Sequence, residues 1–367
     1  KMTVDWADKN RLFVATDFGA GTMTDSGYAR IVKEWTRGTP LSTAKIMLEG
    51  EKADMGVSAQ ATDHGGIHHE LVRRGITFYT AENFIRVGSK IVKLDVPAHS
   101  DIAFFGKQFI VTPKESWTTG GKTFTSGSVL AMDFDAFQKG ERNFAVLFEP
   151  SDSTSFTGAA YTKNYVLLQS LDNVKSSLKE WKLEKGKWVS RAVNLPTMGA
   201  VGISAFDADH SDDYLLSYSD YLTPSVYQMA HAGNDQREQL KSSPAFFDAA
   251  PFETLQKFAT SKDGTKVPYF MVRRKDVKYD GNNPTLLYGY GGFQISLTPS
   301  YSGALGKTWL EKGGVYVVAN IRGGGEFGPR WHQSALKENR QRAYDDFAAV
   351  AEDLIASKIT SPQHLGA

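Results

Sequence analysis

The sequence contains no cysteine, and this absence removes several kinds of chemistry together. Disulfides, a thiolate nucleophile and cysteine-based metal sites are all excluded, which fits a reducing compartment without requiring one. No apolar run approaches the ~20 residues that a helix needs to cross a bilayer. Lys and Arg (42) nearly balance Asp and Glu (41), and the formal net charge is +1. The charge therefore favours neither nucleic acid nor an anionic membrane as a partner.

Helical periodicity is nearly absent from the first 250 residues. Short runs rich in Val, Ile, Phe and Tyr recur instead, bounded by Gly, Asp, Asn, Ser or Pro, as strands are. Examples are RLFVATD, YVLLQSL and VYQMAHA. The strand-and-turn unit returns at roughly 45 to 50 residues, the spacing of four-stranded propeller blades. We count about five units and predict a partial β-propeller over residues 1–251, with no helix longer than about two turns.

The pattern changes after Pro251, where strands begin to alternate with helices. A hairpin comes first, because Asp263-Gly264 between two strand patterns is a strong turn signal. The later elements are strands at 285–290 and 315–321, helices at 302–313 and 343–358, and a strand beginning near Leu365. Near-continuous apolar strands between helices are typical of a parallel sheet covered on both faces. Residues 252–367 are therefore predicted to be the first part of an α/β domain.

Four motifs in this region, YGYGGFQIS, ANIRGGGEFGPRWH, DDF and TSPQHL, resemble those of the prolyl oligopeptidase family of serine peptidases. The SKDGTKVP segment before them resembles the family's entry into its catalytic domain. The resemblance implies a β-propeller followed by an α/β-hydrolase fold. It places the nucleophile, in a Gly-Gly-Ser-x-Gly-Gly turn, just beyond Ala367. Since no Gly-x-Ser-x-Gly occurs in the sequence, we expect this chain to lack the catalytic triad.

The resemblance implies two site residues, each at a position that matches a functional residue of the family. Tyr290 matches the tyrosine whose hydroxyl donates a hydrogen bond to the oxyanion, and burial in the core is its alternative. Phe293 matches the aromatic residue that lines the pocket for a proline-type side chain, and ordinary packing is its alternative. The Tyr-Gly-Gly-Phe form favours the prolyl branch over oligopeptidase B, whose equivalent stretch resembles Tyr-Gly-Ser-Tyr-Gly. Tyr288 is expected to be structural.

The second glycine-rich segment, 322–326, lacks the Lys-Ser/Thr of a phosphate-binding P-loop. We expect a buried loop beside the active site, held by ion pairs of Arg322 and Glu326. His332 is not expected to be the triad histidine, which would follow the nucleophile in chain order.

Three of the eight histidines, His64, His68 and His69, precede Glu70. Imidazoles and carboxylates suit zinc. However, His68 and His69 point to opposite faces of a predicted strand, and the spacing is not that of HExxH. We therefore expect a solvated blade edge there. An acidic turn at 207–213 lacks calcium-loop spacing. No metal and no cofactor are expected.

The resemblance implies a serine endopeptidase that cleaves short peptides after proline through an acyl-enzyme. An oligopeptidase B-like or dipeptidyl-peptidase-like enzyme, or a non-catalytic propeller that binds a partner, are the alternatives. The intact protein is expected to be a monomer, and the 367 residues alone to be inactive. The first residues show no signal-peptide pattern, so we expect a cytoplasmic location, or a periplasmic one if a signal peptide preceded this chain.

Overall fold

The computed structural model describes residues 2–196 and 198–367. The chain forms two compact units, Lys1–Phe148 and Glu149–Ala367. None of the helices in these described ranges has the length and apolar character that a membrane span requires.

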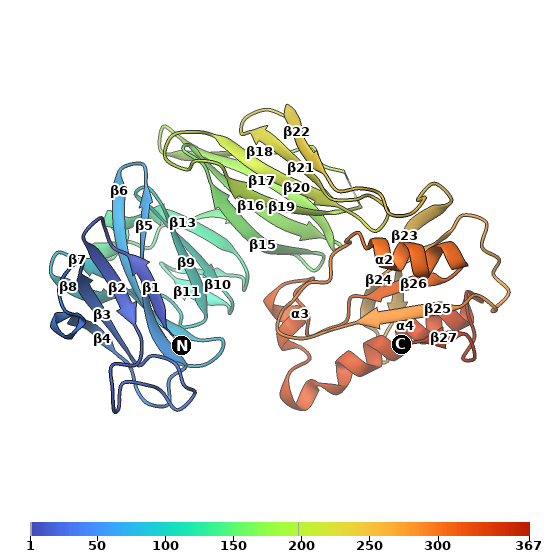
Figure 1. Ribbon diagram of the computed structural model, residues 1–367, viewed down its shortest axis with the longest axis horizontal. Helices are drawn as coiled ribbons and strands as arrows, with labels where there is room; N and C mark the ends of the chain where they lie inside the picture. The colour runs from blue at the N-terminus through green and yellow to red at the C-terminus, as the bar shows by residue number, and fades with distance from the viewer. Residues whose placement is uncertain (1, 197) are drawn as a thin grey trace. The chain divides into compact units, whose positions relative to one another are not determined.

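The first unit contains three four-stranded antiparallel sheets (Figure 1). They comprise β1 (Thr3–Trp6), β2 (Arg11–Ala15), β3 (Ile31–Thr36) and β4 (Lys45–Glu49); β5 (Gly56–His64), β6 (Ile67–Gly75), β7 (Ala81–Val87) and β8 (Lys90–Lys93); and β9 (Ser100–Phe105), β10 (Gln108–Pro113), β13 (Val129–Asp133) and β14 (Ala145–Phe148). A two-stranded ribbon, β11 (Trp117–Thr119) and β12 (Lys122–Phe124), is inserted in the third sheet. Consecutive strands pair through short turns, which is the arrangement of a propeller blade.

The second unit begins with two more sheets of the same kind. They comprise β15 (Thr154–Tyr161), β16 (Tyr165–Asp172), β17 (Lys175–Glu184) and β18 (Lys187–Ala192), then β19 (Ala200–Ala205), β20 (Asp213–Ser219), β21 (Val226–His231) and β22 (Arg237–Ser242). The expected five four-stranded units are thus present. In the part of 1–251 that the structure describes, only η1 (Leu41–Thr43) and the five-residue α1 (Phe134–Gln138) are helical, which confirms the prediction of short helices.

The last sheet has the order β23-β24-β26-β25-β27. Its strands are β23 (Phe252–Thr260), β24 (Lys266–Arg274), β25 (Thr285–Gly289), β26 (Val315–Ala319) and β27 (Leu365–Gly366). Strands β26, β25 and β27 are parallel, but β23, β24 and β26 pair antiparallel. The expected hairpin forms the antiparallel edge, and the strands that alternate with helices are parallel, as expected. The tight Asp263-Gly264 turn reverses the chain, whereas the later strands return through longer crossovers and run parallel.

The helices of this region are α2 (Gly303–Thr308), η2 (Leu310–Lys312), α3 (Pro329–Gln333), η3 (Lys337–Asn339) and α4 (Gln341–Ala356). The helix expected at 302–313 is thus divided in two, and it ends at Gly313, which adopts a φ of 90°. Ser302 caps α2 by accepting a hydrogen bond from the backbone of Leu305.

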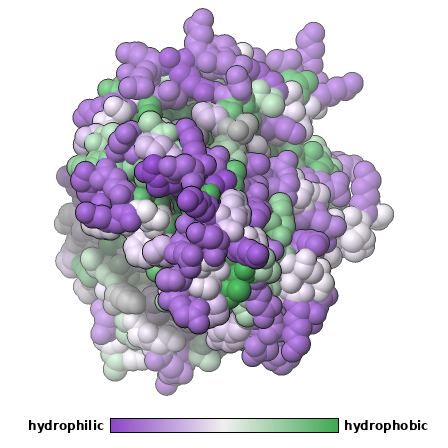
Figure 2. Space-filling view, turned by 90° about the vertical axis from the view of Figure 1, so that its right-hand side faces the viewer, coloured by the Kyte–Doolittle hydropathy of each residue, from purple (hydrophilic) through white to green (hydrophobic). Residues whose placement is uncertain are grey.

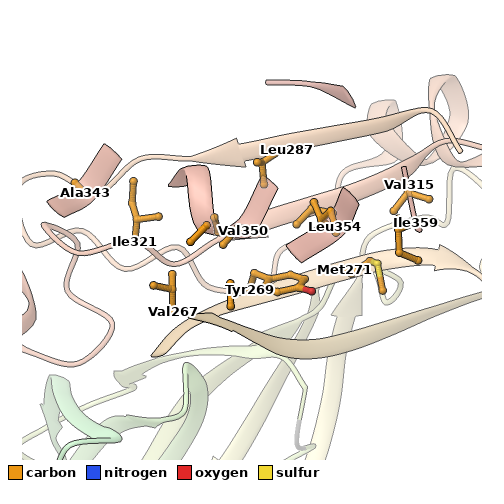
Figure 3. Packing of buried hydrophobic residues seen from close by; sticks show 14 of the residues in the cluster. Val267, Tyr269, Met271, Leu287, Val315, Ile321, Ala343, Val350, Leu354 and Ile359 are labelled. Atoms are coloured by element: carbon orange, nitrogen blue, oxygen red, sulfur yellow. The ribbon is translucent and has the colours of Figure 1, made fainter. Parts of the chain in front are cut away.

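Both faces of the last sheet are covered, as expected. Tyr269 and Met271 point to one face, where they pack with Val350 and Leu354 of α4 (Figure 3). The alternate residues of β24 point to the other face, in a cluster that includes Tyr221 and the segment around Phe247. Because this cluster joins the last sheet to residues that precede it, Glu149–Ala367 is one compact unit. The domain boundary at 251/252 stays a prediction, although β23 begins at Phe252.

Candidate functional site

Two glycine-rich loops meet where β25 and β26 end. We call residues 290–297 the tyrosine loop and residues 320–328 the arginine loop. The carboxyl ends of neighbouring parallel strands lie at one edge of a sheet, which is where α/β folds place their binding sites. The backbone of Gln294 donates to the carbonyl of Gly323 at 3.3 Å, and that of Gly325 donates to Ile295 at 3.2 Å. The two loops are therefore hydrogen-bonded to each other along their backbones.

Glycine is required where the two loops come closest. Gly291 has a φ of 60°, and a Cβ built on it would lie 2.5 Å from the side chain of Ile321. Gly323 has a φ of 96°, and its Cβ would lie 2.3 Å from the carbonyl oxygen of Gly291. Both conformations and both distances exclude a larger residue without a shift of the backbone. These glycines allow the two backbones to pack closely.

The arginine loop is held by an ion-pair network in which Arg322 and Asp346 are buried and Asp263 is exposed. The guanidinium of Arg322 donates to Asp346 at 2.6 and 2.9 Å and to Asp263 at 2.6 and 3.1 Å. The hydrogen bonds from Arg322 hold the pKa of Asp263 well below its usual range. Bidentate pairs of this kind fix the orientation of both partners. The expected ion pair of Arg322 is confirmed; sequence reasoning missed its partners, although Asp346 lies in the DDF motif and Asp263 in the hairpin turn.

Glu326 corrects an expectation, because no cation pairs with it among the described residues. Its carboxyl group, 1% exposed, accepts hydrogen bonds from the backbone of Leu297 at 2.9 Å and from Asn320 at 3.3 Å. Burial raises its pKa to about 7, since an uncompensated charge is costly in an apolar interior. Its carbonyl accepts from the hydroxyl of Ser155 on β15 at 2.8 Å. Glu326 thus holds the tyrosine loop through its hydrogen bond with Leu297, and it is a weaker acid than an ordinary glutamate.

His332 is 2% exposed and lies under the same loops. Its Nδ1 lies 2.7 Å from the carbonyl oxygen of Gly323 in the arginine loop and 3.1 Å from the backbone nitrogen of Gln294 in the tyrosine loop. The imidazole ring therefore contacts the backbones of both loops.

Tyr290 and Phe293 both point away from the core. Tyr290 is 41% exposed, so the alternative of a buried core tyrosine is wrong. Its hydroxyl has no hydrogen-bond partner among the described residues. Phe293 is 59% exposed and has a φ of 52°, an uncommon conformation for an aromatic residue. Tyr288, expected to be structural, is also exposed. Tyr290 and Phe293 thus both lie exposed on the tyrosine loop, which follows β25, and their roles stay predictions.

The histidine cluster of the first unit is not a solvated blade edge. Glu70 is 3% exposed and pairs with Arg11 at 2.7 Å and Arg86 at 2.6 Å. His69 stacks on Phe104 with ring centroids 3.9 Å apart. The expectation failed because Arg11 and Arg86 cover Glu70 and Phe104 covers His69, whereas His68 is exposed. Across the residues that the structure describes, no group of three or more His, Asp or Glu side chains is arranged to hold a metal ion.

Comparison with known proteins gives the same assignment as the motifs. The model of the prolyl oligopeptidase family matches residues 299–367, and that of the prolyl oligopeptidase N-terminal β-propeller domain matches residues 107–243. An uncharacterized peptidase of Sinorhizobium fredii is 44% identical over all of this chain and 52% of that protein. The chain belongs to the prolyl oligopeptidase family. Its fold is accordingly a partial β-propeller followed by the first part of the α/β-hydrolase domain of a serine peptidase family.

Two further proteins that resemble this prolyl oligopeptidase family chain have names that state an activity. A prolyl endopeptidase of Elizabethkingia meningoseptica is 35% identical over 57% of this chain and 28% of that protein. The structure of a post-proline cleaving enzyme from Rickettsia typhi matches with a TM-score of 0.92 at 30% identity, over 100% of this chain and 54% of that chain. The chain spans about half the length of the curated relatives that it matches first.

Proposed function

We propose that the protein carrying this chain is a serine endopeptidase that cleaves short peptides after proline. One observation carries the proposal: Tyr290 presents an exposed hydroxyl, without a partner among the described residues, on a loop whose backbone is held on several sides. Relatives named as prolyl endopeptidase and post-proline cleaving enzyme support the substrate class. We propose no cofactor, a monomeric state and a cytoplasmic location, the last open to a periplasmic alternative.

The proposed reaction is acyl transfer to a serine. The serine oxygen attacks the carbonyl carbon of the peptide bond and gives its proton to a histidine, which passes it to the leaving amine; water then hydrolyses the acyl-enzyme. Serine, histidine and the orienting aspartate are proposed to follow Ala367. Negative charge develops on the carbonyl oxygen in each tetrahedral intermediate. Tyr290 would donate a hydrogen bond to that oxygen, and such a donor stabilises the transition state more than the substrate.

Phe293 would supply the substrate preference. Its exposed ring offers an apolar surface to the ring of a proline residue. Residues 288–295 contain no carboxylate that could pair with the guanidinium of an arginine substrate. An oligopeptidase B-like enzyme would need such a partner, so this loop favours the prolyl alternative.

The test compares matched peptide substrates that differ only in proline or arginine before the cleaved bond, with a full-length protein that carries this chain. We expect kcat/KM to favour proline by at least about tenfold, which corresponds to about 1.4 kcal/mol of transition-state binding. Equal values or a preference for arginine would indicate the oligopeptidase B-like alternative. Absence of turnover with both substrates would indicate a non-catalytic binding protein.

A further inference from the structure

We infer that Arg340 is a positioning residue for Tyr290 and acts through the backbone of the tyrosine loop. The inference rests on the proposed oxyanion role of Tyr290. It adds a residue outside both glycine-rich loops to the machinery of the site.

Arg340 directly precedes α4, and its side chain reaches back to the tyrosine loop. Its Nη1 donates a hydrogen bond to the carbonyl of Gly291, the residue that follows Tyr290. The same nitrogen lies 2.8 Å from the position that a Cβ on Gly323 would occupy, so the guanidinium touches both loops. The aromatic ring of Tyr344, one turn into α4, lies 5.4 Å from the guanidinium carbon of Arg340. This cation–π contact holds the arginine in place.

The tyrosine loop depends on such an anchor. Tyr290 lies between Gly289 and Gly291, and Gly292 follows, so the chain around it has unusually large conformational freedom. Contacts restrict the two adjoining glycines: a Cβ on Gly289 would lie 2.9 Å from the ring of Phe347, and Gly291 packs against Ile321. The hydrogen bond from Arg340 restricts the orientation of the peptide group between Gly291 and Gly292.

The side chain of Tyr290 makes this anchor important for catalysis. Its hydroxyl has no hydrogen bond to a described residue, so its place is set by the backbone that carries it. A donor must lie within about 3 Å of the developing oxyanion to be effective. A displacement of about 1 Å in a positioned group can cost about 10²-fold in rate. Loss of the Arg340 bond should therefore reduce the contribution of Tyr290 without removing any group that touches the substrate.

The first test is Arg340→Met in the full-length protein, with kcat expressed per active site titrated with a fluorophosphonate. We expect kcat to fall about tenfold at nearly unchanged KM, because misplacement of an oxyanion donor affects the transition state more than substrate binding. Arg340→Lys retains a donor and should recover part of the loss. Arg342→Met is the matched control: Arg342 lies two residues further along, is exposed and donates to the carbonyl of Ser334, so its kcat should not change.

The second test repeats Arg340→Met in a Tyr290→Phe background. If Arg340 acts through the Tyr290 hydroxyl, the double variant should be no slower than Tyr290→Phe alone, within about twofold. Equal losses in both backgrounds, or an unchanged kcat for Arg340→Met alone, would overturn the positioning role and leave the role of Tyr290 intact. An unchanged kcat for Tyr290→Phe would instead overturn the proposed oxyanion role, and the inference with it.

Discussion

The carboxylate of Asp346 accepts hydrogen bonds from both the side chain and the backbone of Arg322. The backbone bond is 2.9 Å long and the shortest side-chain bond is 2.6 Å. Asp346 is fully buried and Arg322 is 4% exposed. The pair therefore ties α4 to the first turn of the arginine loop, and through that loop to the backbone beside Tyr290.

Asp346→Asn should destabilise the protein by roughly 1–3 kcal/mol, because buried N–H groups of Arg322 lose a charged acceptor while the bonds to Asp263 remain. Asp345→Asn is the control, since Asp345 is partly exposed and accepts a hydrogen bond only from Gln341 on the same helix face. Its effect should stay within about 0.5 kcal/mol. Denaturant unfolding of both variants measures the difference, and equal midpoints would contradict the structural importance of the pair.

Glu326 should make stability fall as the pH rises. Burial raises the folded-state pKa to about 7 from an ordinary value of 4.5. Between these two pH values the folded state binds more protons than the unfolded state. The contribution of Glu326 to the free energy of unfolding is therefore fully present below pH 4.5 and is lost as the pH rises to about 7. The decrease should be roughly 3 kcal/mol. In Glu326→Gln this part of the pH dependence should be absent. Unfolding midpoints at pH 5 and pH 8 test this, and an identical pH dependence in both proteins would count against it.

Substitution of two glycines separates steric overlap from backbone conformation. Gly291→Ala combines a positive φ with a Cβ 2.5 Å from Ile321, whereas Gly264→Ala has a positive φ of 88° and no atom within 4 Å. Gly264→Ala should cost only the conformational penalty of roughly 1–2 kcal/mol. We expect Gly291→Ala to be clearly more destabilising and to lower kcat as well. The test measures the melting temperature and kcat of both variants. Similar melting temperatures would show that the tyrosine loop accommodates the added Cβ.

Tyr290→Phe keeps the ring and removes only the proposed donor. We expect kcat to fall by about 10²–10³, roughly 2.7–4 kcal/mol, with a smaller change in KM. The melting temperature should hardly change, because the hydroxyl is exposed and leaves no buried group unpaired. Both quantities are measured on one variant. A lower melting temperature with an unchanged kcat would show that the residue is structural.

The 367-residue chain by itself should not react with a serine-directed fluorophosphonate. Its sequence contains no Gly-x-Ser-x-Gly turn in which a serine could be activated. A full-length protein that carries the chain should be labelled at one serine. Labelling of the purified 367-residue chain would show that one of its own serines is a nucleophile.

The sequence by itself determined the features that depend on neighbouring residues. Alternating apolar residues predicted strands that lie in five four-stranded sheets. Asp263-Gly264 predicted the hairpin between β23 and β24, and Gly313 marked the end of a helix. The motifs at 288–293 and 322–332 indicated the prolyl oligopeptidase family. These signals are local, because turn geometry and strand alternation depend on residues close together in the chain.

Only the tertiary structure decided which distant residues meet. Arg322 pairs with Asp346 and Asp263, which are separated from it by 24 and 59 positions, and no local pattern specifies such partners. Glu326 was expected to form an ion pair, but it is buried between the loops with no cation beside it in the described part of the chain, and burial raises its pKa. The burial of Glu70 likewise depends on Arg11 and Arg86, which are distant from it in the sequence. Burial and long-range pairing arise only when the chain closes on itself, and they set the charge state and position of the groups around Tyr290.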